Sequence, residues 1–215
     1  MPKTIEIIPA INAANFEEVK NKIKLVEPYV RWVHLDVADG TFTPNTIWHN
    51  PIDLLTMETP LAIEVHLMIS DMDTRWPDWI LQNVRRIIFH LEAAHDPNFV
   101  LEKIKAAGKE VGVAAEPATD WKKLEPFCTK ADLVQILAVP PGIAGQGFIF
   151  QTLDKIKHIR RAHPQGIIEV DGGVNLETGK NAAAAGANIL VSANYIFSSD
   201  NIKKAIEDLK NAASA

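Results

Sequence analysis

The segment VRWVHLDVADGTFTPN, residues 30–45, places an imidazole and a carboxylate two positions apart in an otherwise apolar run. These side chains belong to His34 and Asp36. Side chains at positions i and i+2 of a β-strand point to the same face, so the two polar groups share one face while the apolar residues around them take the other. If the shared face is the protein interior, both groups need a partner, because an unpaired buried ionisable group is costly.

Two more polar residues end similar apolar runs, namely His66 in IEVHLMI and Asp171 in IIEVDGGV. Two imidazoles and two carboxylates make an N2O2 donor set, which suits a divalent transition metal such as Zn, Mn or Fe. Each residue alone also has an ordinary structural interpretation, as a buried histidine bonded to the backbone or as an aspartate that caps the next helix. The four together favour a metal site, provided that the fold brings them to one place.

The composition predicts one globular domain over residues 1–215, with 47% apolar residues and a formal net charge of −5. A chain of this length and apolar content can bury a full core. It contains no Lys/Arg cluster that would track a phosphate backbone, so we expect no nucleic-acid partner. Long apolar spans and a signal-peptide pattern are missing, and the single Cys128 cannot form an internal disulfide. We therefore expect no membrane association and a cytoplasmic location.

The chain alternates short β-branched runs with longer amphipathic stretches, which is the pattern of parallel βα units. The expected strands are residues 5–11, 31–37, 62–69, 85–92, 109–117, 131–139, 166–174 and 187–197. Helices are expected over residues 15–29, 96–109, 152–163 and 175–187, several of which open on Asn or Asp or close on Gly. Eight such strands in one uninterrupted domain predict a (β/α)8 TIM barrel, an α/β fold, with an open doubly wound sheet as the alternative.

A barrel gives the four polar residues a common location. In such barrels the catalytic groups lie at the C-terminal ends of the strands, which meet at one mouth. His34 and Asp36 lie at that end of the second expected strand. His66 lies near the end of the third and Asp171 at the end of the seventh. The fold and the residue types together therefore predict one metal-binding cluster at the barrel mouth.

Four motifs carry a family resemblance: VHLDVADGTFTPN, EVHLMI, VPPGIAGQGF and IEVDGGVN. In this order and at these separations they resemble the ribulose-phosphate 3-epimerases over nearly the whole chain. The resemblance implies an isomerase of the pentose phosphate pathway that interconverts D-ribulose 5-phosphate and D-xylulose 5-phosphate and forms homo-oligomers. It also implies one divalent metal ion, zinc first with Mn, Fe or Co as alternatives, held by His34, Asp36, His66 and Asp171.

The same resemblance makes the two aspartates the acid/base pair, and the chemistry of epimerisation agrees. Inverting a carbon next to a carbonyl requires removal of a proton from one face and return of a proton to the other. One carboxylate on each side of the substrate achieves this, while a metal polarises the ketone oxygen so that an enediolate can form. Asp36 and Asp171 come from separate strands, so we assign them as this pair. Their roles exchange with the direction of the reaction.

Substrate contacts are predicted near the same strand ends. Met68 and Leu137 would form an apolar cover over the intermediate, although both are also common core residues. Phosphate is best held by backbone N–H groups, which barrels often supply from the loops after their last strands. The predicted substrate-binding residues are His66, Met68, Gly142, Ile143, Ala144, Gly145, Gly172, Gly173, Ala193 and Asn194.

The sequence departs from the family pattern where substrate contacts are expected. Ala10 stands in place of the family's serine in the first strand, Pro140 and Ala144 change the loop after the sixth, and Ala193 with Asn194 stand in place of a Gly-Ser pair after the eighth. The intact metal set with altered contacts leaves open an epimerase for another ketose phosphate, such as a hexulose 6-phosphate. A non-catalytic sugar-phosphate-binding barrel is a further alternative.

A lyase of the related decarboxylase type is disfavoured, because its D-x-K motif is absent and Asp36 is followed by Val37 and Ala38. His90 and Glu92 repeat the i, i+2 arrangement on the fourth strand, and we expect them to orient the metal ligands from behind. Glu116, where the family commonly has Asn, is expected to be a solvated loop residue.

Overall fold

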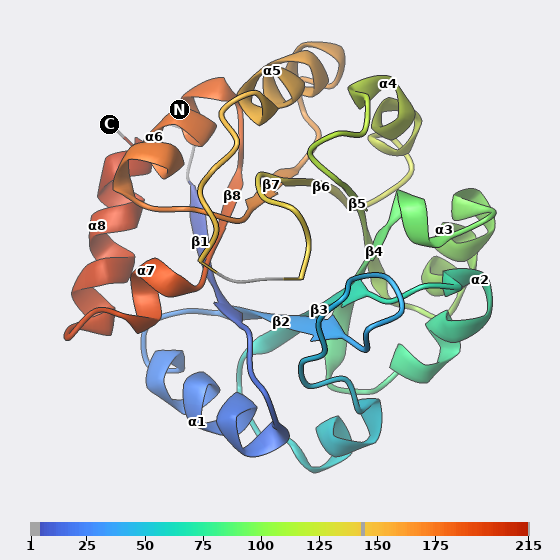
Figure 1. Ribbon diagram of the computed structural model, residues 1–215, viewed down its shortest axis with the longest axis horizontal. Coiled ribbons are helices and arrows are strands. Elements are labelled where there is room, and N and C mark those ends of the chain that lie inside the picture. The colour runs from blue at the N-terminus through green and yellow to red at the C-terminus, as the bar shows by residue number, and fades with distance from the viewer. Residues whose placement is uncertain (1–4, 143–144, 215) are drawn as a thin grey trace.

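The structure is a computed structural model that describes residues 5–142 and 145–214. These residues form a closed barrel of parallel strands that follow one another around the barrel in chain order, with helices outside (Figure 1). The strands are β1 (Glu6–Ile11), β2 (Trp32–Ala38), β3 (Ala62–Met68), β4 (Val84–His90), β5 (Glu110–Ala115), β6 (Leu133–Leu137), β7 (Ile168–Asp171) and β8 (Ile189–Ser192). Pairing of β8 with β1 closes the sheet, which confirms the predicted (β/α)8 barrel over the open-sheet alternative.

The helices surround the barrel (Figure 1). They are α1 (Phe16–Val26), α2 (Met72–Arg75), α3 (Pro97–Ala106), α4 (Trp121–Leu124), α5 (Thr152–Ala162), α6 (Leu176–Ala185), α7 (Asn194–Phe197) and α8 (Ile202–Ser214). Short 3₁₀ turns are η1 (Pro51–Thr56), η2 (Trp76–Trp79), η3 (Leu91–Ala93) and η4 (Glu125–Phe127). Within the described ranges no helix combines the length and the apolar character needed to span a membrane.

Side-chain caps explain where three of the predicted helices begin. Asn15 caps α1, Asp96 caps α3 and Asn175 caps α6, each by accepting a backbone N–H of the first turn. A helix leaves its first N–H groups without intrahelical acceptors, and such side chains satisfy one of them. The Asn and Asp residues that open these segments in the sequence are therefore correct start signals.

One predicted strand is wrong in its second half. The apolar run over residues 187–197 predicts a single strand, but β8 ends at Ser192 and the following residues form the short helix α7. The amides of Ile196 and Phe197 donate to the carbonyl of Ala193 at 3.1 and 3.0 Å, which turns the chain. A short apolar run is compatible with either a strand or a helix, so periodicity alone does not separate them.

The two faces of each strand bury different kinds of side chain. On β2, Val33, Leu35 and Val37 are fully buried in the apolar layer between barrel and helices. His34 and Asp36 point the other way, into the barrel, as the i, i+2 spacing predicts. The barrel interior also holds a small apolar cluster, made of Ile8, Ala10, Ile88, Ala114, Leu133, Leu137, Ile189 and Val191. The barrel interior therefore holds apolar side chains beside the polar groups, and some of them lie at the level of the ligands, as the pairs Ala10–His34 and Leu137–Asp171 show.

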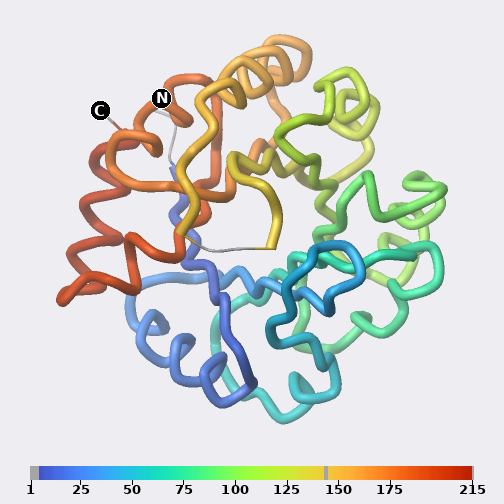
Figure 2. Tube along the Cα trace, in the orientation of Figure 1, coloured from blue at the N-terminus to red at the C-terminus, as the bar shows by residue number. Residues whose placement is uncertain are grey.

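The loops after β2 and β6 meet over the mouth. In Figure 2 the yellow segment after β6 extends across the barrel centre, and the blue segment after β2 lies opposite it. The side-chain amide of Asn45, after β2, donates to the carbonyl of Gly142, after β6. This contact joins two loops that are far apart in sequence at the entrance to the barrel.

Close packing inside the barrel yields a stability prediction. Alanine at Gly112 of β5 would place its Cβ 2.8 Å from both Ile88 Cγ1 and Leu133 Cδ1. We expect Gly112→Ala to lower the free energy of unfolding by about 1–3 kcal/mol, measured by urea denaturation, because overpacking forces neighbours to shift. The control is Gly166→Ala, whose Cβ would meet its nearest neighbour at 3.4 Å. Equal effects of the two changes would contradict the tight interior.

Candidate active site and metal centre

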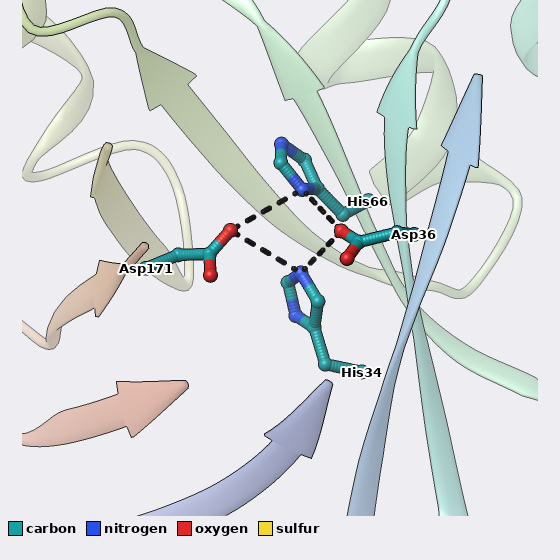
Figure 3. Close-up of side chains that lie close together, drawn as sticks. All are labelled: His34, Asp36, His66 and Asp171. Carbon is teal, nitrogen blue, oxygen red and sulfur yellow. Dashed lines mark hydrogen bonds and ion pairs between the residues drawn. The ribbon is translucent and has the colours of Figure 1, made fainter. Parts of the chain in front are cut away.

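The four predicted ligands converge at the C-terminal end of the barrel (Figure 3). Nδ1 of His66 lies 3.1 Å from Oδ1 of Asp36 and 3.6 Å from Oδ2 of Asp171. Nε2 of His34 lies 3.5 Å from the same oxygen of Asp36 and 3.8 Å from that of Asp171. One ligand atom from each residue lies within 4.8 Å of the other three. The carboxylates face each other from opposite sides of the two imidazoles (Figure 3).

The donor set fits a divalent transition metal. Among the described residues, Nε2 of His34 is fully buried without a hydrogen-bond partner, although two carboxylates surround it. A buried polar atom of this kind requires a partner, and a cation placed between the four groups would provide one. Two nitrogens and two carboxylate oxygens match the ligand preferences of Zn and its neighbours. The residues that would hold the ion are therefore His34, Asp36, His66 and Asp171.

The two carboxylates have opposite electrostatic environments. Burial disfavours ionisation of Asp36, but its contacts with the His34 and His66 rings outweigh burial and hold its pKa below its usual range. Burial raises the pKa of Asp171 to about 6, and the nearby charge of Asp36 adds to the shift while His34 opposes it. For His34, burial alone would lower the pKa, yet the nearby carboxylate of Asp36 and the hydrogen bond with Glu64 raise it well above its ordinary value. The site thus holds one readily ionised carboxylate and one that takes up a proton at a higher pH than an ordinary aspartate does.

His90 and Glu92 lie on the side of His66 that points away from the two aspartates, and they orient its ring. Its Nε2 lies 2.9 Å from Nε2 of His90, and Nδ1 of His90 lies 3.5 Å from Oε2 of Glu92. Burial lowers the pKa of His90 to about 4, so its ring is neutral and can accept a hydrogen bond from His66. With its proton on Nε2 engaged by His90, His66 would offer the Nδ1 lone pair to an ion held between Asp36 and Asp171. The geometry agrees with the expected orienting role of His90 and Glu92.

A cavity of about 290 Å³ opens directly above this cluster. It is lined by Asp36, His66 and Asp171 together with most of the predicted substrate-binding residues, namely Met68, Gly142, Gly145, Gly172, Gly173, Ala193 and Asn194. Leu137 and Ala10 also line it. Ile143 and Ala144, two further predicted substrate contacts, lie outside the described residues. Glu116 does not line the cavity; it is half-buried, and its backbone N–H donates to Glu92.

The two glycines after β7 are required by packing. Gly172 and Gly173 have φ values of +101° and +65°, a region that L side chains rarely adopt. A Cβ on Gly172 would lie 2.4 Å from Val139, and one on Gly173 would lie 2.8 Å from the backbone nitrogen of Phe148. Both contacts are to the segment after β6. Glycine here lets the loops after β6 and β7 approach closely enough to form one wall of the cavity.

Residues of the barrel interior below the ligands were not predicted. Nδ1 of His34 lies 2.7 Å from Oε1 of Glu64, and Glu64 in turn accepts from Arg86 at 2.6 Å. Glu169 accepts from the amide of Gln135 at 3.1 Å, also fully buried. Glu64 and Glu169 each precede a predicted ligand by two residues, so the same-face rule was a signal that could have found them. Arg86 lies four residues before His90 on the same strand, so the same rule also applied to it.

A (β/α)8 barrel with two histidines and two aspartates converging at its mouth defines a metalloenzyme-like site, and comparison with known proteins narrows the class. Residues 6–197 match the ribulose-phosphate 3 epimerase family. A ribulose-phosphate 3-epimerase of Bacillus subtilis (strain 168) is 36% identical over 215 residues, covering 97% of this chain and 99% of that protein. The chloroplastic ribulose-5-phosphate-3-epimerase of Arabidopsis thaliana is 35% identical, covering 96% of this chain and 76% of that protein.

Solved structures add a likeness of fold alone. The crystal structure of KGPDC from Streptococcus mutans aligns with a TM-score of 0.69 at 11% identity, covering 98% of this chain and 97% of that chain. The assignment to a family therefore rests on the family match and on the relatives, and not on this likeness of fold. The chain belongs to the ribulose-phosphate 3-epimerase family and is an enzyme of the isomerase class.

The site predicts metal binding that depends on both histidines. We expect the purified protein to bind about one divalent ion per chain, and His34→Ala and His66→Ala to lose it, because each removes one of the four ligands. Elemental analysis after dialysis measures the content. The control is His95→Ala, which removes an exposed histidine that is not part of the ligand cluster, and this variant should keep the ion. Metal-free wild-type protein, or variants with wild-type metal content, would rule out this ligand set.

Proposed function

We propose that the protein is a metal-dependent 3-epimerase that interconverts D-ribulose 5-phosphate and D-xylulose 5-phosphate. The observation that carries the proposal is the pair of carboxylates, Asp36 and Asp171, on opposite sides of the two imidazoles at the floor of the cavity. Membership of the family supports the same reaction. The relatives from Bacillus and Arabidopsis are named for it.

The ion, zinc or otherwise Mn, Fe or Co, would be held by His34, Asp36, His66 and Asp171. When bound, it supplies Lewis-acid polarisation of the substrate's ketone oxygen and neighbouring hydroxyl. The histidines contribute position as well as ligation, because His90 fixes the ring of His66. Asp36 and Asp171 have a second task, which is to move the proton.

Proton transfer is assigned to the two aspartates as a pair. One carboxylate removes the proton from C3 on its side of the substrate, and the other carboxylic acid returns a proton on the opposite side. The environments suit this division, since Asp36 is readily ionised whereas burial raises the pKa of Asp171 to about 6. Met68 and Leu137 border the same cavity and would exclude water from the enediolate. In the reverse direction the two aspartates exchange roles.

The phosphate group is assigned to the loops that line the far wall. The segments that hold Gly145, Gly172 and Gly173 border the cavity, as does the turn at Ala193 and Asn194 that begins α7. The first turn of a helix has N–H groups without intrahelical acceptors, which suit a phosphate oxygen. Glycine backbones permit the close approach that such bonds need.

A second candidate substrate is a longer ketose phosphate, such as a hexulose 6-phosphate. It is favoured by the departures at Ala10, Ala193 and Asn194, all of which line the cavity. These residues alter the walls that would contact the sugar chain while the ligand set is intact. A homo-oligomeric state, expected from the family resemblance, and a cytoplasmic location, expected from the sequence pattern and the single cysteine, stay predictions.

Loss of either aspartate tests the two-base mechanism. We expect Asp36→Asn and Asp171→Asn to lower kcat for epimerisation of D-ribulose 5-phosphate by about 10²–10⁴-fold or more, because each variant lacks the acid/base group on one side of the substrate. In D₂O each variant should exchange the C3 hydrogen of only one epimer, and the two variants should differ in which epimer that is. Proton NMR of each epimer measures the exchange, and metal analysis of each variant separates proton transfer from loss of the ion.

The matched control for these variants is Glu116→Gln, a carboxyl group near the mouth that does not line the cavity. It should keep kcat within about twofold of wild type, as expected for a side chain with no contact to the reacting atoms. Near wild-type turnover by either aspartate variant would show that the two-base assignment is wrong.

Substrate choice is tested by comparing phosphorylated and free sugars. A hydrogen bond to a charged group is worth about 1.5–3 kcal/mol, so losing several should lower kcat/KM by more than about a hundredfold. We therefore expect D-ribulose 5-phosphate or a hexulose 6-phosphate to be turned over far better than their unphosphorylated forms. Equal turnover of the free sugars would contradict the phosphate site.

Restoring the family residues separates the two phosphorylated candidates. Ala10→Ser and Asn194→Ser should leave kcat/KM for D-ribulose 5-phosphate unchanged or lower if the enzyme is adapted to the pentulose. A clear increase, together with better wild-type turnover of the hexulose 6-phosphate, would favour the second candidate.

A further inference from the structure

A row of charged side chains crosses the barrel interior directly below the metal site. The pairing register places His34 of β2 opposite Glu64 of β3, Glu64 opposite Arg86 of β4, and Arg86 opposite Glu110 of β5. Four neighbouring strands thus contribute one residue each to a continuous line. No part of the proposed reaction uses Glu64, Arg86 or Glu110.

The row ends on a metal ligand through short, charge-assisted contacts. Arg86 Nη1 donates to Glu64 Oε2 at 2.6 Å, and the other oxygen of Glu64 lies 2.7 Å from Nδ1 of His34. Both Glu64 and His34 are completely buried. A histidine that donates its Nδ1–H to a carboxylate presents its Nε2 lone pair on the other side of the ring. Nε2 of His34 is the atom that faces Asp36 and Asp171.

Arg86 makes this arrangement possible. An ionised carboxylate in a dry interior requires a partner charge, since removing one member of a buried pair leaves the other uncompensated. Arg86 supplies that charge through a fork that also donates from Nη2 to Glu110 Oε2 at 2.7 Å, and its guanidinium lies 4.3 Å from the centre of the Trp32 ring. The side chain is therefore fixed on three sides and is only 11% exposed.

A local irregularity in the sheet selects Arg86 over its neighbour. The register between β3 and β4 shifts after Ile63, which pairs with Val84, so that Glu64 pairs with Arg86 and skips Arg85. Such a shift re-aims side chains along a strand. Arg85 is directed outward, where it is 63% exposed and bonds Glu110 at 2.8 Å without reaching Glu64.

A second cation does not explain these groups as well. His34, Glu64 and Glu169 are close enough together to hold one. Both carboxylates already accept hydrogen bonds, Glu64 from Arg86 and Glu169 from the amide of Gln135. A guanidinium already provides the positive charge that an ion would supply.

From this geometry we infer that Arg86 and Glu64 are positioning residues for the metal centre, which act through His34 by fixing its ring orientation and the nitrogen that it offers. The inference rests on the metal site of the proposed function. It predicts that metal affinity is controlled from the closed interior of the barrel by residues that contact neither metal nor substrate.

The inference is tested by measuring the metal affinity of variants at Arg86 and Glu64. Partners of a ligating histidine typically contribute about tenfold to a hundredfold to metal affinity, so Arg86→Met and Glu64→Gln should each raise the Kd for Zn²⁺ by that factor. Arg86→Lys, which keeps the charge without the fork, should restore part of the affinity. Competition with a chromophoric chelator measures Kd, and the visible absorption of the Co²⁺-loaded proteins reports on the ligand geometry.

Arg85→Met is the matched control, because Arg85 shares Glu110 and the face of Trp32 with Arg86 but does not contact Glu64. Its Kd should equal that of wild type within about twofold. The double variant Glu64→Gln/Arg86→Met should bind no more weakly than the weaker single variant, because the two residues act through one contact. If the two changes acted through independent structural damage, their losses of metal-binding free energy would instead add in the double variant.

The outcomes separate this inference from the proposed function. Wild-type protein that binds no metal would overturn the proposed function and this inference with it. Normal binding by wild type and by folded Arg86→Met overturns only the inference, as do equal losses in the Arg85 and Arg86 variants. If Arg86→Met does not fold, Glu64→Gln and Arg86→Lys decide the question by the same measurement, and unchanged affinity in both contradicts it.

Discussion

The register between β2 and β3 is the constraint on which the site depends. It pairs Asp36 with His66 and His34 with Glu64, so that each of the two ligands on β2 lies directly opposite its contact on β3. Because side chains alternate across a strand, a slip of one residue would turn one strand's set of polar groups to the outer face. The apolar alternate residues, packed against the helices, hold this register. Packing outside the barrel thereby sets the chemistry inside it.

Charge inside the barrel is arranged in two levels. At the upper level the carboxylates of Asp36 and Asp171 surround the ligand nitrogens. At the lower level burial disfavours ionisation of Glu64, yet the hydrogen bond from His34 and the charge of Arg86 keep its pKa below the ordinary value. Burial raises the pKa of Glu169 well above its ordinary value, and Glu64 adds to the shift. The environment therefore favours the charged form of Glu64, which is paired with Arg86, and the neutral form of Glu169, an arrangement that disfavours two uncompensated anions beneath the site.

The sequence was sufficient for the parts of the structure that local rules determine. The i, i+2 spacing of His34 and Asp36 fixes a common face, and the direction of the strands in a barrel fixes the end at which they meet the other ligands. The same alternation places Arg86 on the inward face of β4 with Ile88 and His90, but its pairing with Glu64 depends on a register shift that a single strand's pattern does not reveal. The strand predicted over residues 187–197 failed because its apolar run is compatible with either a strand or a helix, and local hydrogen bonds to the carbonyl of Ala193 begin a helix after Ser192.

Three of the departures from the family pattern, Ala10, Ala193 and Asn194, line the cavity, whereas the four candidate ligands lie at and below its floor. Asp36 and Asp171 are fixed by strand pairing and by the buried groups below them, so a change there would disturb the barrel as well as the reaction. Ala193 and Asn194 lie after the last strand, where the sheet no longer restricts the side chain. Side chains at such positions after a strand can therefore change with less cost to the fold than the ligands, which lie on the paired strands. This division explains how a chain can keep the ligand set of its family and still alter which sugar phosphate it accepts.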